Sequence, residues 1–270
     1  GTGTYLLGII DHALGRVETE EGLGAVAGAA TTLIKNLHGF EWMVGPYAVC
    51  QLRFTRAMTA HGATLPKEGP GIYLTNTLES PHTEPPAPPL FHQPIAREHQ
   101  RALKIKDRER VLVCLGNPPY GRHEAATKEN RMTTGGWVRH ADESDPASPI
   151  LEDFLEPARA AGYGVHLKNL YNHYVYFMRW ALWKVFEHKT ASGPGVVSFI
   201  TASSYLDGDA FVGLREHMRR VCDHVDIIDL GGEGRGTRQD ENVFAIKTPV
   251  AIFVAWREGS GNHSEPAIVR

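Results

Sequence analysis

The segment VLVCLGNPPY, residues 111–120, decides the fold. Residues 111–115 are all apolar, which is typical of a strand that is covered on both faces in a parallel sheet. Gly116 follows, and then NPPY at 117–120, where two prolines stiffen the backbone. Open α/β sheets bind their ligands beyond the carboxyl ends of the strands. The segment therefore predicts a parallel sheet with a functional loop directly after one of its strands.

Outward from this segment, helical and strand-like patterns alternate, which favours an α/β fold with a mostly parallel sheet. The expected helices are 6–13, 22–37, 46–58, 95–110, 165–188 and 208–221. The expected strands are 71–74, 111–115, 195–202 and 225–230, with a strand tip or loop at 40–44 and a final hairpin of 243–246 and 250–256. An antiparallel strand is expected to close the C-terminal edge of the sheet. We expect one domain over 1–270, with insertions or loops at 80–110 and 121–165.

The composition excludes several classes of protein. The 270 residues are 42% hydrophobic and 22% charged, as in ordinary globular proteins. No apolar run reaches the roughly 18 residues that a membrane span needs. No secretory leader is visible either, so we expect a cytoplasmic, bacterial-type protein without a membrane role. Cys50, Cys114 and Cys222 are scattered, as expected of reduced thiols, and CxxC and HExxH are absent, so no metal site is expected.

The net charge of −3 is low for a stand-alone DNA-binding module. Any contact with nucleic acid is therefore expected from a local basic surface, and the basic residues that follow NPPY are the best placed. They are Arg122, His123, Lys128, Arg131, Arg139 and His140. Contacts from such residues to phosphates add affinity without sequence information. The basic residues within 97–110 alternate with acids and are interpreted as a solvated helix face.

The loop Asn117-Pro118-Pro119-Tyr120 suits chemistry on the exocyclic amine of adenine. That amine is planar, because its lone pair is drawn into the ring, and it must become more tetrahedral to attack a methyl group. Two acceptors, the Asn117 side-chain oxygen and the Pro118 carbonyl, can bind its two hydrogens and favour that geometry. Tyr120 offers a ring on which a planar base can stack. Since stacking uses only the ring, loss of the Tyr120 hydroxyl is expected to matter little.

The motifs together resemble a known family. GTGTY at 1–5, followed by NPPY at 117–120, resembles the adenine-N6 DNA methyltransferases of the N-P-P-Y type. The detail resembles the methylase region of large single-chain restriction-modification enzymes. The matching segments follow the expected order over nearly the whole chain: 38–41, 45–49, 73–79, 115–120, 203–206, 214–217, 241–244 and 250–252.

This resemblance implies a class I S-adenosylmethionine-dependent methyltransferase of Rossmann-like fold that acts on an adenine flipped out of double-stranded DNA. The family pattern places Gly1 and Gly3 where the backbone approaches the cofactor. Glu41 stands where the ribose hydroxyls are bound, and Asn76 where the family often has aspartate beside the cofactor adenine. In full, the cofactor-binding residues that the resemblance implies are Gly1, Thr2, Gly3, Glu41, Asn76 and Thr77.

The family's first motif begins with a strand before the glycines. The chain is therefore expected to be N-terminally truncated, with that first strand missing, and to bind the cofactor weakly by itself. A target-recognition domain, and a nuclease or translocase, are expected outside these residues.

Other interpretations stay open. A glutamine-N5 protein methyltransferase also uses NPPY, although the insert at 80–110 exceeds what a compact protein-modifying enzyme needs. A non-catalytic DNA-binding or structural fragment is a third candidate. Cytosine-C5 methylation is disfavoured, since each cysteine follows valine rather than proline. Glu41 could be an exposed loop acid and Asn76 a turn former, and Tyr205 could line a base pocket or pack in the core. The aromatic helix 165–188 is interpreted as core, and 231–236 as a glycine-rich loop.

Overall fold

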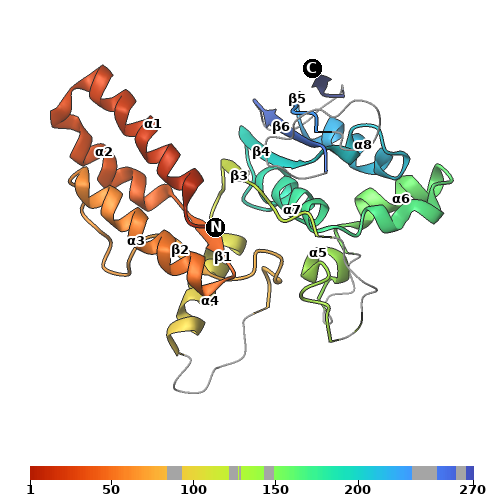
Figure 1. Ribbon diagram of the computed structural model, residues 1–270, viewed down its shortest axis with the longest axis horizontal. Coiled ribbons are helices and arrows are strands. Elements are labelled where there is room, and N and C mark those ends of the chain that lie inside the picture. Colours follow the sequence, from red (N-terminus) through yellow and green to blue (C-terminus); the bar gives the residue numbers. More distant parts are fainter. Residues whose placement is uncertain (84–92, 122–126, 128, 143–148, 233–247, 260–265) are drawn as a thin grey trace. The chain divides into compact units, whose positions relative to one another are not determined.

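The computed structural model describes residues 1–83, 93–121, 127, 129–142, 149–232, 248–259 and 266–270 (Figure 1). The chain divides into two compact units, and each is described by itself. Unit 1 is built from residues 1–77 and from the part of helix α4 that ends at Lys104. Unit 2 is built from residues 78–83 and from residue 105 onward. Among the described residues, no helix is both long enough and apolar enough to cross a membrane.

Unit 1 combines three helices with a small parallel sheet. The helices are α1 (Thr4–Glu21), α2 (Leu23–Asn36) and α3 (Val44–Ala60), and the strands are β1 (Gly39–Glu41) and β2 (Ile72–Leu74). β1 and β2 pair in parallel, with Phe40 opposite Tyr73. The helices expected at 6–13, 22–37 and 46–58 are therefore confirmed, and the first of them is longer than expected. The strand tip expected after Gly39 is a true strand.

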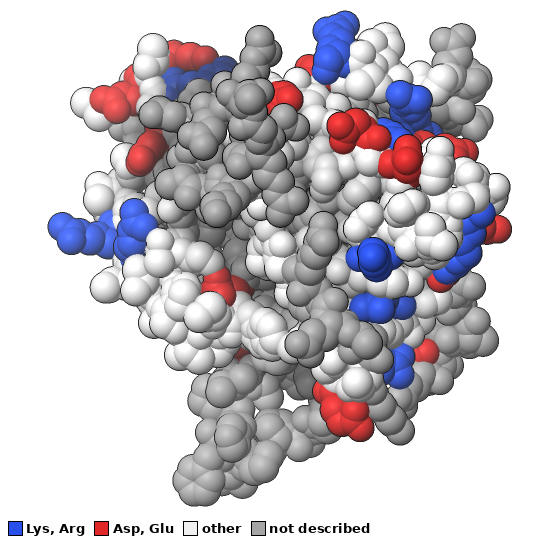
Figure 2. All heavy atoms as spheres, turned by 45° about the vertical axis from the view of Figure 1, so that its right-hand side comes forward, with Lys and Arg blue, Asp and Glu red and all other residues white. Residues whose placement is uncertain are grey.

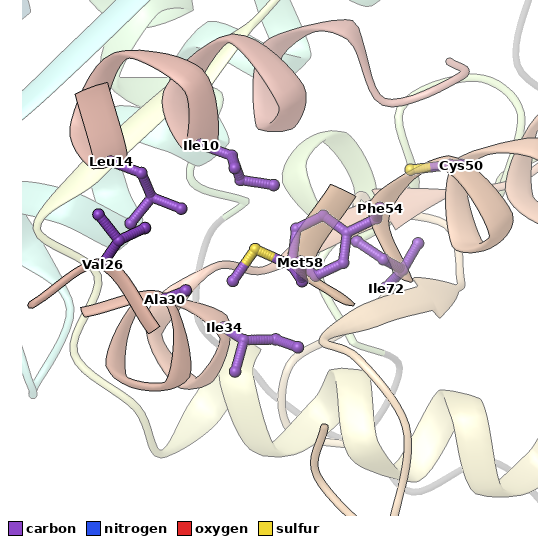
Figure 3. Close-up of a cluster of buried hydrophobic side chains, with 9 residues drawn as sticks. All are labelled: Ile10, Leu14, Val26, Ala30, Ile34, Cys50, Phe54, Met58 and Ile72. Atoms are coloured by element: carbon purple, nitrogen blue, oxygen red, sulfur yellow. The ribbon is translucent and has the colours of Figure 1, made fainter. Parts of the chain in front are cut away.

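The core of unit 1 follows from apolar residues spaced four apart, which form one stripe on each helix. The side chains of these stripes converge between the helices (Figure 3). The core comprises Ile10 and Leu14 of α1; Val26, Ala30 and Ile34 of α2; Cys50, Phe54 and Met58 of α3; and Ile72 of β2. Phe54 and Met58 are fully buried. A single stripe per helix explains why the opposite faces of α1 and α2 are exposed.

Unit 2 contains a five-stranded mixed sheet in the order β3-β4-β6-β5-β7. β3 (Val113–Gly116) is parallel to β4 (Gly195–Ala202). β6 (Val250–Arg257) runs antiparallel to both β4 and β5 (His224–Asp229), and β7 (Ile268–Val269) is parallel to β5. The antiparallel strand expected at the sheet edge thus lies between two strands that are parallel to each other. The other half of the expected hairpin, 243–246, lies outside the described residues.

The strand that carries the NPPY loop is more exposed than its sequence predicts. Val113 is 53% exposed and Leu115 39% exposed, so the expectation of a strand covered on both faces is wrong for the structure described. The physical reason is its position. β3 ends the strand order of its sheet and, among the described residues, pairs with β4 alone. Apolar composition identified the strand correctly but did not determine how well it is covered.

The aromatic segment expected to be one helix over 165–188 is interrupted. A 3-10 turn (Gly164–Asn169) is followed by α7 (His173–Leu182) and then by a π-helical turn (Trp183–Glu187). Asn172 caps α7, because its side-chain oxygen accepts a hydrogen bond from the backbone N–H of Tyr174. The expectation that the segment 165–188 is core is confirmed for α7, where nearly every side chain is buried, whereas no residue of the 3-10 turn is buried.

The regions expected to be insertions or loops also contain helices. α4 (Gln93–Asp107) lies within 80–110, and α5 (Gly136–His140) and α6 (Glu152–Ala160) lie within 121–165. The helix expected over 208–221 is α8 (Val212–Val221), preceded by a 3-10 turn. α6 and α8 pack closely, since a Cβ at Gly213 would lie 2.3 Å from the carbonyl oxygen of Phe154.

Candidate active site

The NPPY loop leaves the sheet at the carboxyl end of β3, beside the parallel strand β4. Gly116 is the last residue of β3, and a Cβ at this position would lie 3.0 Å from the ring of Phe199 on β4. Pro118 is buried, whereas Asn117 and Pro119 are exposed. The loop is therefore anchored through its first proline, while the Asn117 carboxamide faces outward from the sheet edge, where ligands of α/β sheets bind.

The Tyr120 hydroxyl ties the loop to itself and to β4. It donates a hydrogen bond of 2.9 Å to Oδ1 of Asn117 and lies 3.3 Å from the carbonyl oxygen of Ile200. Ile200 is two residues before the end of β4, so this contact joins the loop to the neighbouring strand. The Tyr120 ring is half-buried. It stands edge-on to the ring of Tyr174, with centroids 6.5 Å apart.

The start of α7 supplies a second anchor for the loop. Asn172 Nδ2 donates to the carbonyl oxygen of Tyr120 over 3.3 Å, while its Oδ1 caps the helix. The backbone N–H of His173 donates to the carbonyl oxygen of Gly121 over 3.2 Å. Sequence reasoning missed Asn172, although an asparagine just before a helical run is a recognised N-cap signal. The Asn172 side chain thus holds the end of the NPPY loop and caps α7 at the same time.

Tyr205 takes the packing role of its two expected alternatives. It is 1% exposed, and its ring meets that of Phe253 on β6 edge to face, with centroids 6.2 Å apart. Its neighbour Ser204 is exposed and shares a 2.9 Å hydrogen bond with the hydroxyl of Tyr174. Burial raises the pKa of Tyr205 far above its ordinary value. Its hydroxyl therefore stays neutral, and its ring is core rather than pocket lining.

The residues expected at a cofactor site begin with the turn before α1. Gly3 has a φ of +86°, a left-handed conformation that side chains disfavour, and its carbonyl oxygen accepts the first hydrogen bond of the helix, from Leu7. A Cβ there would lie 2.8 Å from Sγ of Cys50 on α3. Thr2 is held through its carbonyl oxygen by Arg53 Nη1 at 3.0 Å. Two independent constraints therefore require glycine at position 3.

Glu41 is the last residue of β1 and Asn76 follows the end of β2, and these two strands are parallel neighbours. Glu41 is opposite Leu74 in the register of β1 and β2, and its carbonyl oxygen accepts from the N–H of Thr75 over 2.9 Å. One side-chain oxygen of Glu41 accepts from the N–H of Met43, and the other contacts the amino group of Gly1. Asn76 is only 6% exposed. Gly1 and Glu41 are thus in contact, and Asn76 follows on the next strand.

These expected residues divide between the units. Gly1, Thr2, Gly3, Glu41, Asn76 and Thr77 belong to unit 1, and Asn117, Pro118, Pro119 and Tyr120 to unit 2. Each group is held by its own unit. A carboxylate at a strand end can accept hydrogen bonds from a diol, and an exposed carboxamide oxygen can accept one from an amine.

The basic residues expected at phosphates divide into two sets. Arg122, His123 and Lys128 lie outside the described residues. Arg131 and Arg139 are used internally: Arg131 donates to the carbonyl oxygen of His140 over 2.9 Å, and Arg139 lies 3.9 Å above the ring of Tyr171. Burial and the nearby Arg139 and Arg131 charges lower the pKa of His140. On the face in Figure 2, basic and acidic side chains are interspersed.

The helix face expected to be solvated is partly buried. Lys106 of α4 is 2% exposed, and its ammonium lies 3.6 Å from a carboxylate oxygen of Glu79. Burial lowers the pKa of Lys106 to about 8, although the Glu79 charge opposes the shift. Lys184 is also buried and donates to the carbonyl oxygens of Lys106 and Glu109 at 2.8 Å each. Both lysines therefore support the end of α4 rather than a charged surface.

An ionic cluster around the buried Arg179 and His217 joins α6, α8 and the end of α7, and we call it the clasp; its members are Asp153, Arg179, Glu187, His217 and Arg220. Arg179 is 1% exposed and reaches Asp153 at 2.5 Å and Glu187 at 2.7 Å. His217 Nε2 lies 2.9 Å from Glu187, and its Nδ1 lies 2.8 Å from Nη2 of Arg220. Because a guanidinium only donates, Nδ1 must accept, and His217 is the neutral Nε2–H tautomer. Asp153, Glu187 and His217 have the spacing of a metal site, but Arg179 already forms ion pairs with both carboxylates.

Comparison with known proteins supports the fold. No protein-family profile and no curated protein matches the chain. Among solved structures, the "ATP-dependent Type ISP restriction-modification enzyme LlaBIII bound to DNA" is 21% identical with a TM-score of 0.75, covering 100% of this chain and 17% of its own. A nuclease-deletion mutant of the Type ISP restriction-modification enzyme LlaGI, in complex with a DNA substrate mimic, is 20% identical with a TM-score of 0.69, covering 100% and 21%.

A third similar structure is a DrdV–DNA complex, 21% identical with a TM-score of 0.61, covering 95% of this chain and 22% of its own. The chain therefore spans about a fifth of the length of these structures. At this identity the similarity shows the fold, a mixed α/β arrangement like that of regions of Type ISP restriction-modification enzymes.

Proposed function

We propose that this chain is the catalytic region of a class I S-adenosylmethionine-dependent DNA methyltransferase that modifies the N6 amine of adenine. The observation that carries the proposal is the NPPY loop. Its Asn117 is exposed after the carboxyl end of β3, while Tyr120 is held by Ile200 of β4 and by Asn172 at the start of α7. A fixed, solvent-facing acceptor at that edge is what chemistry on an amine requires.

The reaction asks Asn117 and Pro118 to bind the two amine hydrogens. Oδ1 of Asn117 and the backbone oxygen of Pro118 act as acceptors, which draws the amine toward a tetrahedral shape and directs its lone pair outward. As the nitrogen forms its new bond it gains positive charge, and the two acceptors stabilise that charge more than they stabilise the resting amine. When the N–C bond forms, the bond from the methyl group to the sulfonium sulfur of the donor would break, and its electron pair would leave with sulfur as a neutral thioether. The methylated amine then gives a proton to solvent, which leaves the base neutral.

The residues at the strand ends of unit 1 fit S-adenosylmethionine. Glu41 offers a carboxylate for the ribose hydroxyls and Asn76 a carboxamide for the adenine. Gly1 and Gly3 add two positions without side chains in the turn before α1. The constraint on Gly3 is consistent with this assignment, since a side chain at position 3 would displace Cys50 and the backbone there stays bare. When bound, the cofactor supplies an electrophilic methyl group.

DNA is the substrate that the similar structures favour, since all three are complexes with DNA or a DNA substrate mimic. A base can reach an exposed loop only after it has left the helical stack. The half-buried ring of Tyr120 offers it a stacking surface. We further propose that the chain acts within a restriction-modification enzyme, because two of the three similar structures are such enzymes.

The test is Asn117→Ala in the protein as it is encoded, with whatever sequence flanks residues 1–270. Loss of one preorganised acceptor typically costs about 3–4 kcal/mol, on the order of a hundred- to thousand-fold in rate. The measurement is tritiated methyl transfer to unmethylated DNA, followed by digestion to identify N6-methyladenine. Cofactor affinity, measured by calorimetry, should stay nearly unchanged, because Asn117 acts on the amine alone.

The matched control is Asn36→Ala, which removes an exposed carboxamide at the end of α2 and should leave the rate unchanged. If Asn117→Ala keeps more than about a tenth of the parental rate, a deficit under about 1.4 kcal/mol, Asn117 is not the amine acceptor. If the parent protein methylates a protein glutamine and does not methylate DNA, the substrate is an amide rather than adenine. A parent protein that transfers no methyl group to either would make this region non-catalytic.

A further inference from the structure

We infer that the Tyr120 hydroxyl is a positioning group that orients the Asn117 carboxamide for the amine. The inference rests on the proposed function. It revises the expectation that only the ring of Tyr120 matters, because the structure gives its hydroxyl two defined partners. These are Asn117 Oδ1 at 2.9 Å and the carbonyl oxygen of Ile200 at 3.3 Å.

The need for such a group follows from the shape of a carboxamide. Its two ends are nearly identical in size, but one only accepts and the other only donates hydrogen bonds. A half-turn of the Asn117 side chain would therefore present N–H groups to an amine that must itself donate. Asn117 is exposed, so packing alone does not choose between the two orientations. A hydrogen-bond partner can make that choice.

Tyr120 makes it by donating to Oδ1. That oxygen carries two lone pairs, so it can hold the hydroxyl with one and the amine with the other. An acceptor at this place, such as a carboxylate, would bind the N–H end of the Asn117 carboxamide instead. A hydroxyl that donates its proton binds the oxygen end. The shorter distance to Asn117 than to Ile200 assigns the proton mainly to the carboxamide.

The hydroxyl can do this only if Tyr120 is itself held in place, and three contacts hold it. Its carbonyl oxygen accepts from Nδ2 of Asn172, its ring stands edge-on to Tyr174, and its hydroxyl reaches the end of β4 at Ile200. These contacts come from two different elements, α7 and β4. The orientation of Asn117 is therefore fixed before substrate arrives, which is the condition for an acceptor to stabilise a transition state.

The experiment compares the parent with Tyr120→Phe, which keeps the ring and removes the hydroxyl. We expect kcat to fall about 2- to 13-fold, with little change in KM for DNA, because a net hydrogen bond is lost while stacking is kept. Fluorescence of 2-aminopurine at the target position should show unchanged base flipping. Tyr163→Phe, a half-buried tyrosine away from the loop, is the matched control and should match the parent.

A second comparison separates positioning from general loosening of the loop. In the Asn117→Asp background both side-chain oxygens accept, so orientation no longer matters, and the further loss from Tyr120→Phe should shrink to less than twofold. Crystal structures at better than about 1.2 Å, where the amide nitrogen and oxygen can be told apart, supply a readout without activity. Asn117 should keep one orientation in the parent and lose it in Tyr120→Phe.

Three outcomes would overturn the inference: a Tyr120→Phe rate equal to the parental rate, equal losses in both backgrounds, or loss of base flipping together with rate. A parent that makes no N6-methyladenine would instead overturn the proposed function. In that case the crystal structures still decide whether Tyr120 orients Asn117.

Discussion

Glu187→Gln should destabilise unit 2 by about 3 kcal/mol at neutral pH. Burial would raise the pKa of Glu187, but the hydrogen bond from His217 and the charge of Arg179 outweigh it and hold the pKa near 2, below its ordinary 4.5. At 1.36 kcal/mol per pH unit, that difference corresponds to about 3 kcal/mol of stability. The neutral amide would also turn N–H groups toward Arg179, which is 1% exposed and would keep only Asp153 as an anionic partner.

The pH dependence has a definite sign. A carboxyl with a lowered folded-state pKa contributes stability above its unfolded value and loses it as the pH falls. The gap between parent and variant should therefore be constant above about pH 5 and close between 4.5 and about 2. Burial also lowers the pKa of His217, so protonation of this histidine disfavours the folded state in both proteins.

The assay is urea unfolding followed by tryptophan fluorescence, which reports mainly on unit 2 because four of the five tryptophans follow residue 105. Glu152→Gln is the matched control. Its ion pair with Arg159 has both side chains more than a third exposed, so its loss should cost no more than about 1 kcal/mol. If Glu187→Gln costs no more than Glu152→Gln, or if the gap does not narrow below pH 4.5, the clasp contributes no such stability.

Two further predictions concern unit 1. Gly3→Ala should destabilise unit 1 by about 1–2 kcal/mol from the left-handed φ alone, and by more if Cys50 cannot move. The control is Gly8→Ala inside α1, where a Cβ has open space and should stabilise by about 0.5–1 kcal/mol. Circular dichroism melts decide it, and equal shifts would contradict it. Glu41→Ala should weaken S-adenosylmethionine binding about 10- to 150-fold by calorimetry, since charged hydrogen bonds contribute about 1.5–3 kcal/mol, while the exposed Glu68→Ala should have no effect. Unchanged affinity would remove Glu41 from the cofactor site.

The parts of the fold that sequence predicts well are those set by local patterns. β4 has the bounds 195–202 that its apolar run predicted, and α3 contains the whole helix expected at 46–58. The strand order is a different matter. The place of β6 between β4 and β5, and the edge position of β3, depend on which strands meet in space, and no local pattern encodes that. Hydrophobicity identified β3 as a strand but could not give its exposure.

The candidate site shows the same division. The position of Asn117 after a strand was predictable, because an apolar run and two prolines mark it. That Asn76 follows a strand was also predictable, from the short strand expected at 71–74. The hydroxyl contact of Tyr120 was not, since Ile200 is 80 residues away in sequence and contributes only a backbone oxygen. The clasp was equally hidden, because its charges are spread over α6, α7 and α8.

The position of α7 explains how a loop that begins on an exposed edge strand can still hold its side chain in place. The helix is buried on nearly every face, so it cannot shift without disrupting the core. Its first turn holds the loop through Asn172 and the N–H of His173, and the residues around its end form the clasp through Arg179. Tyr120 therefore lies between a fixed helix and the end of β4. Its hydrogen bond supports Asn117, although β3 pairs with only one strand among those described. Rigid support of this kind places an acceptor before the substrate arrives.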